Sequence, residues 1–381
     1  MKQDPGFYDY WPYEGRPKIE WPNGARIAFW VAPNIEFYEL DPPANPQRKA
    51  WPQPYPALPG YSIRDYGNRV GHVRQMELLE KYGVRGSISL STALCDHHPE
   101  IIRMCAQRDW EFFSHGIYNT RYTYGMSEQQ ERDMIRDSMQ SIHQHTGQHC
   151  AGYLAPALSH SELTLDLFAE VGTELAGEDA GFYTCDLFHD DQPTPIHTRS
   201  GKAFASIPYS LEMNDTIAYV VNKIEPRRYG QMLKDNFDRL YQEGAESGTV
   251  MCIPTHNYQV SCPHRLRAFE EALEYITGHS DVWVTTGREI ARHFIDNQYQ
   301  QSVADIARRS AGVRAGHWTR STWNIPTAVT AWITGAMTGA CCPGAAGLPG
   351  PMVPNWPCGL TLDCSFSRWT NRASHFRCRA E

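Results

Sequence analysis

The sequence predicts an α/β protein, namely a distorted (β/α) barrel of seven or eight parallel strands followed by an irregular C-terminal tail. Short β-type runs alternate with helical patterns along most of the chain, which is typical of parallel βα units. No repeat with a period of about 20 to 50 residues interrupts this alternation. Polar side chains recur directly after the β-type runs, where a parallel barrel gathers its functional residues on one face.

The predicted strands are short runs rich in β-branched and aromatic residues, at 26–33, 84–91, 110–113, 150–156, 183–186, 203–208, 249–254 and 282–286. Helical patterns lie between them, at 65–82, 99–108, 127–145, 161–172, 227–243, 263–278 and 288–298. Pro99 suits the first turn of one helix. Ser127 opens another with a capping box, and Gly147 follows as its stop.

The chain divides into an expected barrel domain, residues 1–300, and an expected tail, residues 301–381, that is disordered or loosely packed. Within the barrel domain, residues 41–60 carry seven prolines and predict a lid or rim loop without regular helix. The tail is rich in glycine, proline and tryptophan. Residues 325–342 are too weakly apolar to favour a membrane span.

Composition narrows the function classes. The net charge of -8 and the pI of about 6.1, without a basic stripe, argue against a nucleic-acid surface. The first residues lack the charged and apolar regions of a secretory signal, so a cytoplasmic location is expected, with no membrane partner. Six cysteines before residue 300 lie singly, which suits reduced thiols. The expected partner is a small-molecule substrate, and a homo-oligomer is left open.

The stretch 110–124, WEFFSHGIYNTRYTY, is the expected centre of the site, because a buried strand ends there in reactive side chains. Gly116 would let the backbone turn directly after His115. Polar residues follow the other strands in the same way: Asn34, Glu36, Ser91, Thr92, His115, Asn119, Asp186, Tyr209, Glu212, Asn214, Asp215, His256 and Asn257. We therefore expect Glu36, His115 and His256 to meet around one cavity.

From about residue 21 to 299, the chain resembles the polysaccharide deacetylase superfamily, specifically its allantoinase-like and cyclic-imide-hydrolase branch. The segments that carry the resemblance are WPNGARIAFWVAPNIEFYE, DYGNRVGHVRQ, EFFSHG, YLAP, YTCDLFHDD, PYSLEMND, PTHNY and VWVTTGREIARHF. The resemblance implies a distorted barrel and hydrolysis of a carbon–nitrogen bond other than a peptide bond, in an N-acetyl amide or a ring amide.

The chain departs from the deacetylase pattern at three positions. Asn34 stands where the family carries an acid at the first strand, and the HxxxH pair reads His115-Gly-Ile-Tyr-Asn119. Ala155 replaces the arginine before the proline of YLAP. Only Glu36 and His115 remain as metal ligands, whereas a catalytic zinc normally has three protein ligands. The expected cofactor is thus either none or a divalent metal such as zinc.

Roles follow for the remaining residues. Without metal, Glu36, with a raised pKa, is the expected general base, and His256 protonates the departing nitrogen. His115 holds the water or polarises the carbonyl. Asp186 either orients a histidine or caps a turn. Arg69 would hold a carboxylate or imide oxygen. The expected substrate-binding residues are Asn34, Arg69, Asn119, Tyr209, Glu212 and Asn214.

Three functions remain open at this point. The first is ring opening of a small cyclic amide, imide or ureide. The second is N-deacetylation of amino sugars or acylated amines on the same scaffold. The third is a carbohydrate-binding relic without catalysis, motivated by the lost acid and ligand. A closed pocket favours a small molecule and a long groove favours a polymer.

Overall fold

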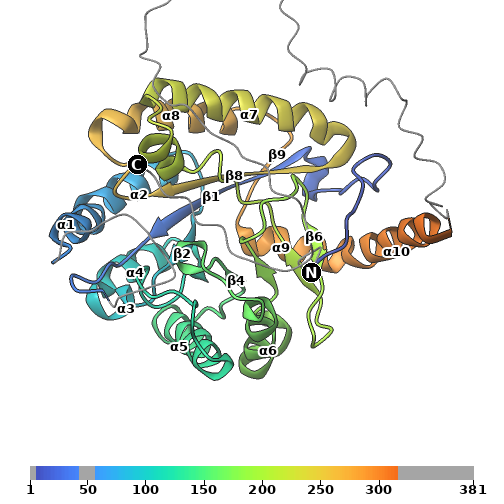
Figure 1. Cartoon of the computed structure of the whole chain (residues 1–381). Coiled ribbons are helices and arrows are strands. Elements are labelled where there is room, and N and C mark those ends of the chain that lie inside the picture. Colours follow the sequence, from blue (N-terminus) through green and yellow to red (C-terminus); the bar gives the residue numbers. More distant parts are fainter. Residues whose placement is uncertain (1–5, 43–55, 316–381) are drawn as a thin grey trace, which may run out of the picture. The chain divides into compact units, whose positions relative to one another are not determined.

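The computed structural model describes residues 6–42 and 56–315, and contains one nine-stranded sheet surrounded by helices (Figure 1). The strands are β1 (Ile27–Ile35), β2 (Ser87–Leu90), β3 (Glu111–Ser114), β4 (Gly152–Tyr153), β5 (Tyr183–Thr184), β6 (Thr194–Ile196), β7 (Phe204–Ser206), β8 (Thr249–His256) and β9 (Val282–Val284). Eight of them pair in parallel, and only β6 runs antiparallel, against β7. The predicted fold class is confirmed.

The sheet is organised around β1, in the order β6-β7-β5-β4-β3-β2-β1-β8. One edge of β1 pairs with β8 from Ile27 to Asn34. A strand has only two edges, so β9 and β2 share the other: β9 pairs at Ile27 to Phe29 and β2 at Asn34 and Ile35. The last two strands in the sequence, β8 and β9, therefore lie beside the first strand, β1. This pairing curls the sheet into a distorted barrel.

Side chains of β1 alternate between two apolar clusters, as the period of a strand requires. Phe29 and Val31 pack in the cluster that includes helix residues such as Leu79 and Phe269, between sheet and helices. Trp30 belongs to the other cluster, with Phe113, Tyr183 and the α9 residue Ile290. This second cluster fills the inside of the curled sheet. The same alternation turns Asn34 and Glu36 toward that inside, at the carboxyl end of β1.

The helices are α1 (Leu58–Tyr66), α2 (His72–Lys81), α3 (Leu94–His97), α4 (Pro99–Ala106), α5 (Glu128–Thr146), α6 (Thr164–Ala176), α7 (Pro226–Ser247), α8 (Pro263–Thr277), α9 (Gly287–Asn297) and α10 (Tyr299–Ala315). Short 3-10 turns η1 (Pro22–Gly24), η3 (Pro156–Leu158) and η4 (Gly177–Asp179) and the π-helical turns η2 (Gly67–Gly71) and η5 (Ile217–Val221) connect them. The capping box at Ser127 and the left-handed stop at Gly147, with φ 73°, are confirmed.

The first helical region differs from its expectation. It begins at Leu58, inside the proline-rich segment, because Pro59 sits in the first turn where its missing N–H costs nothing. The π-helical turn η2 then joins α1 to α2. At Gly71 an added Cβ would lie 2.0 Å from the carbonyl oxygen of Asn257, so only glycine lets this turn approach the loop after β8. The lid expected at 41–60 falls largely on residues 43–55, outside the described residues.

The C-terminal boundary also differs. Helix α10 continues to Ala315, past the boundary expected at residue 300, and packs against the N-terminal arm. The Trp11 indole N–H donates to Asp305 at 3.0 Å, and Arg309 donates to the carbonyl of Glu14 at 2.8 Å. The start of an irregular tail at 301 is therefore wrong for residues 301–315. Within the described residues, no helix is long and apolar enough to cross a membrane, and the weak span weighed at 325–342 lies outside them.

Candidate active site

The carboxylate of Glu36 lies at the centre of a buried polar cluster at the carboxyl ends of β1, β3 and β8. Its Oε1 is 3.5 Å from His115 Nε2 and 3.6 Å from His256 Nε2. The parallel register that aligns Asn34 with His256 brings these strand ends together. The three residues therefore meet around one point, as the sequence predicts. We call Glu36, His115, Asn119, His256 and Tyr258 the Glu36 cluster.

Asp215 binds His256 at Nδ1, the ring nitrogen that does not face Glu36. The His256 Nδ1 donates to Asp215 Oδ1 at 2.6 Å, and its backbone N–H donates to Oδ2 at 2.8 Å. Val260 N–H also donates to Oδ2, at 3.1 Å. Asp215 is fully buried, so its charge is little screened. The sequence placed Asp215 at a strand end without assigning it to a histidine. The pairing fixes the ring and turns Nε2 toward Glu36.

His115 is oriented by the backbone. Its Nδ1 lies 2.9 Å from the carbonyl oxygen of Leu154, which can only accept, so Nδ1 carries the proton. In the neutral ring, Nε2 is then free to accept a hydrogen bond. Gly116 follows with φ 69°, and an added Cβ would lie 2.4 Å from Pro156 Cγ. The predicted turn after His115 is confirmed, and it requires glycine.

Asn119 contributes its NH2 group to the cluster. Its Nδ2 donates to Glu36 Oε1 at 2.6 Å and to the Tyr38 hydroxyl at 2.9 Å. Its Oδ1 accepts from the Ala157 N–H at 2.9 Å. Since a backbone N–H can only donate, the amide cannot flip. Asn119 is therefore a donor to the carboxylate.

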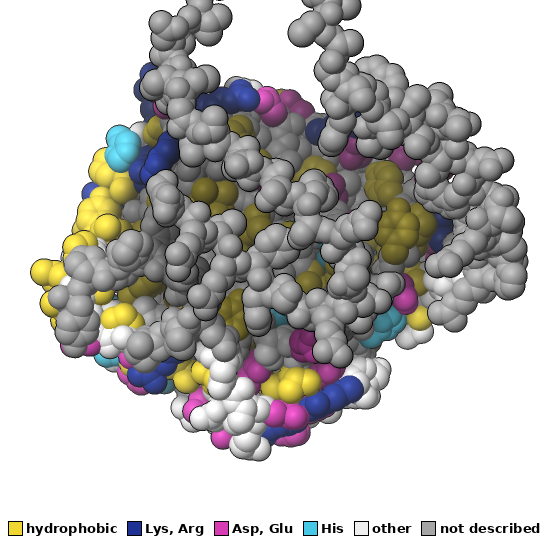
Figure 2. Space-filling view, viewed as in Figure 1, with side chains coloured by type: hydrophobic (Ala, Val, Ile, Leu, Met, Phe, Trp, Pro, Cys, Tyr) yellow, Lys and Arg dark blue, Asp and Glu magenta, His cyan; other side chains and the backbone are white. Residues whose placement is uncertain are grey.

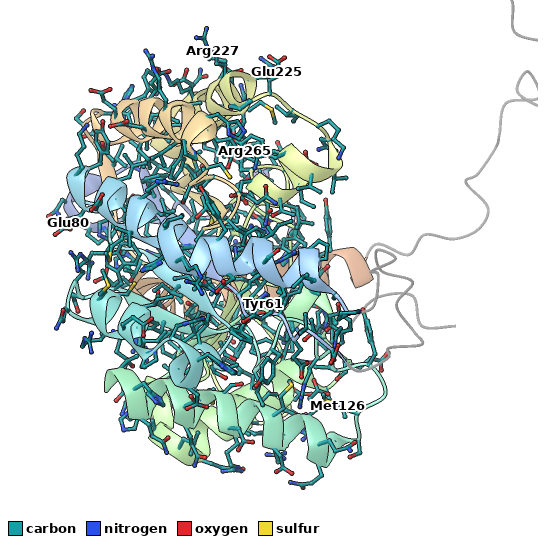
Figure 3. All side chains as sticks on the ribbon, turned by 90° about the vertical axis from the view of Figure 1, so that its left-hand side faces the viewer. Tyr61, Glu80, Met126, Glu225, Arg227 and Arg265 are labelled. Carbon is teal, nitrogen blue, oxygen red and sulfur yellow. The ribbon has the colours of Figure 1, made fainter. Side chains whose placement is uncertain are left out.

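Tyr38, Tyr258 and Arg64 complete the surroundings of the Glu36 carboxylate. The sequence alone did not select any of the three as a site residue. The Tyr258 hydroxyl donates to Glu36 Oε2 at 2.6 Å. The Arg64 guanidinium lies 3.8 Å from the centre of the Tyr38 ring and 4.6 Å from that of Tyr258. Each such cation–π contact contributes about 0.5 to 2 kcal/mol. A small pocket of about 10 Å³ lies beside Arg64 and Tyr61. Tyr61 is labelled on α1 in Figure 3.

The electrostatics of the cluster favour a carboxylate facing an imidazolium. Burial alone would raise the pKa of Glu36, but the charge of His256 and the close approach of both histidine rings hold this pKa well below its usual value. Burial alone would lower the pKa of His256, but the charges of Asp215 and Glu36 raise it to about 9. The expected raised pKa of Glu36 is therefore wrong, because the sequence did not show how closely the two histidines surround it.

Comparison with known proteins shows which family this chain resembles. Residues 64–176 match the family model described as polysaccharide deacetylase. The peptidoglycan deacetylase of Helicobacter pylori is 25% identical over 262 residues, which cover 60% of this chain and 85% of that protein. The crystal structure of the Puue allantoinase superposes with a TM-score of 0.66 at 27% identity, over 75% of this chain and 95% of that one. These matches show that the chain resembles the polysaccharide deacetylase superfamily.

A second solved member of the superfamily gives the same picture. The crystal structure of a probable polysaccharide deacetylase from Pseudomonas aeruginosa PAO1 has a TM-score of 0.66 and 27% identity, over 75% of this chain and 96% of that one. The resemblance expected from the sequence is thereby confirmed, and with it the class of enzyme. As a polysaccharide deacetylase relative, the chain is a hydrolase of carbon–nitrogen bonds.

Polysaccharide deacetylases often depend on a metal, and the groups around Glu36 were tested against such a site. Asn119 presents N–H donors and Tyr258 presents O–H, while the raised pKa of His256 keeps its ring cationic. In this arrangement only Glu36 and His115 Nε2 present electron pairs to a cation. A catalytic zinc normally has three protein ligands, so one ligand is missing. Over residues 6–42 and 56–315 there is no group of three or more His, Cys, Asp or Glu placed for a metal. The residues do not fit a metal.

Three other expected residues, Asn34, Tyr209 and Asp186, are buried at or after strand ends in the barrel of this deacetylase relative. The Asn34 Nδ2 donates to the Tyr209 hydroxyl at 3.0 Å and to the carbonyl of Thr255 at 3.1 Å. Both side chains are almost fully buried. Asp186 accepts from the Ala155 N–H at 2.9 Å and from the Thr184 hydroxyl at 3.3 Å. Of the two roles left open for Asp186, these contacts match the turn cap, at the position where the family arginine is replaced by Ala155.

Three expected substrate residues lie outside the Glu36 cluster. Arg69 is on the outer face of η2, with its side chain 74% exposed and paired with Asp65 at 2.7 Å. Glu212 is exposed to solvent. Asn214 accepts from the N–H groups of Thr216 and Ile217, which makes it a turn cap. These residues lie in loops and turns, where the direction of a side chain depends on the turn geometry. The sequence therefore did not show that they point away from the cluster.

Proposed function

We propose that this protein opens the ring of a small cyclic amide, imide or ureide by hydrolysis. The observation that carries the proposal is the buried Glu36 carboxylate with the Nε2 atoms of His115 and His256 within 3.6 Å of the same oxygen. A carboxylate and an imidazolium on either side of one point are the base and acid that amide hydrolysis needs. Likeness to the Puue allantoinase supports a small substrate.

In the proposed reaction, the Glu36 carboxylate accepts a proton from water, and the water oxygen forms a bond to the carbonyl carbon. The lowered pKa of Glu36 keeps it in the accepting form at neutral pH, at the cost of some driving force. His115 Nε2 accepts the second O–H of that water and so holds it. When the tetrahedral intermediate collapses, the carbon–nitrogen bond breaks and His256 Nε2 gives its proton to the nitrogen.

Burial also supports a small planar substrate over a polymer. The members of the Glu36 cluster are each less than a tenth exposed, and Tyr38, Tyr61 and Arg64 stand beside them. Aromatic rings and a guanidinium plane suit a flat ring with carbonyl oxygens. A polymer would need an open groove.

The second candidate is N-deacetylation, which the similarity to the Helicobacter pylori peptidoglycan deacetylase supports. The same Glu36 and His256 could serve it, since an N-acetyl amide also loses an amine. The two functions differ in product. Ring opening gives one molecule that carries a new acid, whereas deacetylation releases acetate.

The test is a hydrolysis assay with hydantoin, succinimide, allantoin and chitobiose, following both ring opening and acetate release. We expect turnover of at least one cyclic compound, and a loss of about a hundredfold or more in kcat for Glu36→Gln and for His256→Ala. His145→Ala is the matched control, because His145 is exposed on α5. Acetate release alone would replace the proposal by the second candidate, and full activity of Glu36→Gln would reject both mechanisms.

A further inference from the structure

A groove lies on the outer surface between α7 and α8, away from the Glu36 cluster. Its volume is about 460 Å³. The two helices touch beneath it because residue 230 is glycine, where a Cβ would come within 2.6 Å of the carbonyl oxygen of Ala268. This volume is within the range of about 300 to 1,000 Å³ that small-molecule sites show. Nothing in the proposed hydrolysis uses it.

The groove carries positive charge on a chain whose net charge is -8. Arg227 and Lys234 line it from α7, and His264 and Arg267 line it from α8. Its only lining carboxylate is Glu271, 2.8 Å from Arg267. Three permanent cations against one carboxylate leave two positive charges, and His264 adds to them when protonated. Figure 2 shows Lys and Arg side chains along the upper margin, over α7 and α8.

Two helix N-termini add to this charge. Both α7 and α8 start with proline in the first turn, and neither Glu225 nor Cys262 caps its helix with a side-chain hydrogen bond. Figure 3 shows Glu225 and Arg227 together at this end of α7. Uncapped N–H groups at a helix start attract anions, and here they come with side-chain cations. Over the residues described, Arg227 and His264 have no ion pair, so both remain available to a ligand.

We propose that the groove between α7 and α8 binds a small phosphate-bearing anion. Phosphate groups match paired guanidinium and ammonium donors beside helix N-termini, and the volume accommodates a small molecule. Both helices also support the loops of the Glu36 cluster. The Tyr229 hydroxyl on α7 donates to the carbonyl of Met213 at 2.8 Å, and Arg265 on α8 lies 4.3 Å from the centre of the Tyr219 ring. An anion bound in the groove would therefore contact the two helices that support the loops of Asp215 and His256.

The test is isothermal titration of the full chain with inorganic pyrophosphate at low and moderate salt. We expect saturable binding that weakens as salt rises, since the attraction is electrostatic. The double variant Arg227→Ala/Lys234→Ala is expected to weaken binding at least about tenfold, the effect of losing charge-assisted hydrogen bonds. Citrate is the second titrant, and equal affinity for citrate would show that charge alone is read and would reject a phosphate site.

Arg228→Ala is the matched control. Arg228 neighbours Arg227 on α7 but is absent from the groove lining and faces Asp235 at 4.0 Å. Its removal should change affinity less than twofold. Absence of binding, or equal weakening by Arg228→Ala, would overturn the proposal. Glu36→Gln should bind pyrophosphate like the unaltered chain, which separates this site from the proposed hydrolysis.

Discussion

Asp215 Oδ1 and His256 Nδ1 lie 2.6 Å apart inside the barrel, and the charge of Asp215 is one of the causes that raise the pKa of His256. Asp215 has no contact with the point between the two histidines at which water and substrate would meet. In the proposed reaction, Asp215 acts through His256, by fixing the ring and by keeping the proton that the leaving nitrogen needs. It is a positioning residue.

Replacing Asp215 by asparagine should therefore change a pH profile as well as a rate. We expect Asp215→Asn to lower kcat by about a hundredfold or more and to move the alkaline limb of the profile to lower pH, because the pKa of His256 falls toward its usual value. Measuring kcat against pH for both proteins checks this. A variant that loses rate without a shifted limb would mean that Asp215 only holds the loop.

The same pair links stability to pH. The pKa of His256 is raised from 6.5 to about 9 in the folded chain, so its contribution is fully present below pH 6.5 and is lost as pH rises through about 9. The full shift corresponds to about 3 kcal/mol. Urea unfolding from pH 6 to 10 should show a steeper loss for the unaltered chain than for His256→Gln. His145→Gln, exposed on α5, should follow the unaltered chain.

Replacing each of two arginines should distinguish a residue of the site from a residue of the exposed surface. Arg64→Ala should lower kcat/KM about tenfold or more, because the rings of Tyr38 and Tyr258 lose the guanidinium packed against them. Arg69→Ala should stay within about twofold, since Arg69 is exposed and pairs only with Asp65 among the described residues. Steady-state kinetics on both variants checks the contrast. The reverse order would restore Arg69 as the substrate contact.

A single change should create a metal site. In Asn119→His, residues 115 and 119 form a histidine pair next to Glu36, which supplies the third ligand a catalytic zinc needs. We expect about one zinc per chain by metal analysis after dialysis, against little for the unaltered protein. Asn214→His, at a turn cap outside the cluster, is the control. Stoichiometric zinc in the unaltered chain would contradict the donor arrangement described above.

Truncation tests the revised C-terminal boundary. A chain ending at Tyr299 loses α10 and exposes Trp11, whose indole N–H bonds Asp305. Exposing this buried ring should cost about 2 kcal/mol or more of unfolding free energy, seen as a melting temperature lower by several degrees. A chain ending at Ala315 keeps α10 and is the reference. Equal melting temperatures would mean that α10 contributes nothing.

Much of the fold could be predicted because the residue patterns that indicate strands and helices are local in the sequence. Alternation along β1 and polar residues after the strands predicted that Glu36, His115 and His256 meet. The antiparallel strand β6 was missed, since three residues around a proline carry no clear period. Helix α10 was missed because its partners, Trp11 and the carbonyl of Glu14, lie at the other end of the chain.

The finer features of the site required three-dimensional information. Arg64 lies in α1 and Arg69 lies in the π-helical turn η2, so the direction of each side chain depends on where the helix changes its pitch. The sequence pointed to Arg69, and only the fold shows that Arg64 is the arginine that faces Tyr38 and Tyr258. The pKa of Glu36 likewise depends on distances to two histidines that no sequence spacing fixes.

The pairing of β1 with β8 has a consequence for biosynthesis. Ile27 aligns with Thr249 and Asn34 with His256, so the first strand of the sheet lacks one neighbour until the second half of the chain has left the ribosome. Sheets closed by such distant segments assemble slowly. A nascent chain would hold Trp30 and Phe29 partly uncovered for most of its synthesis, which predicts chaperone dependence during expression.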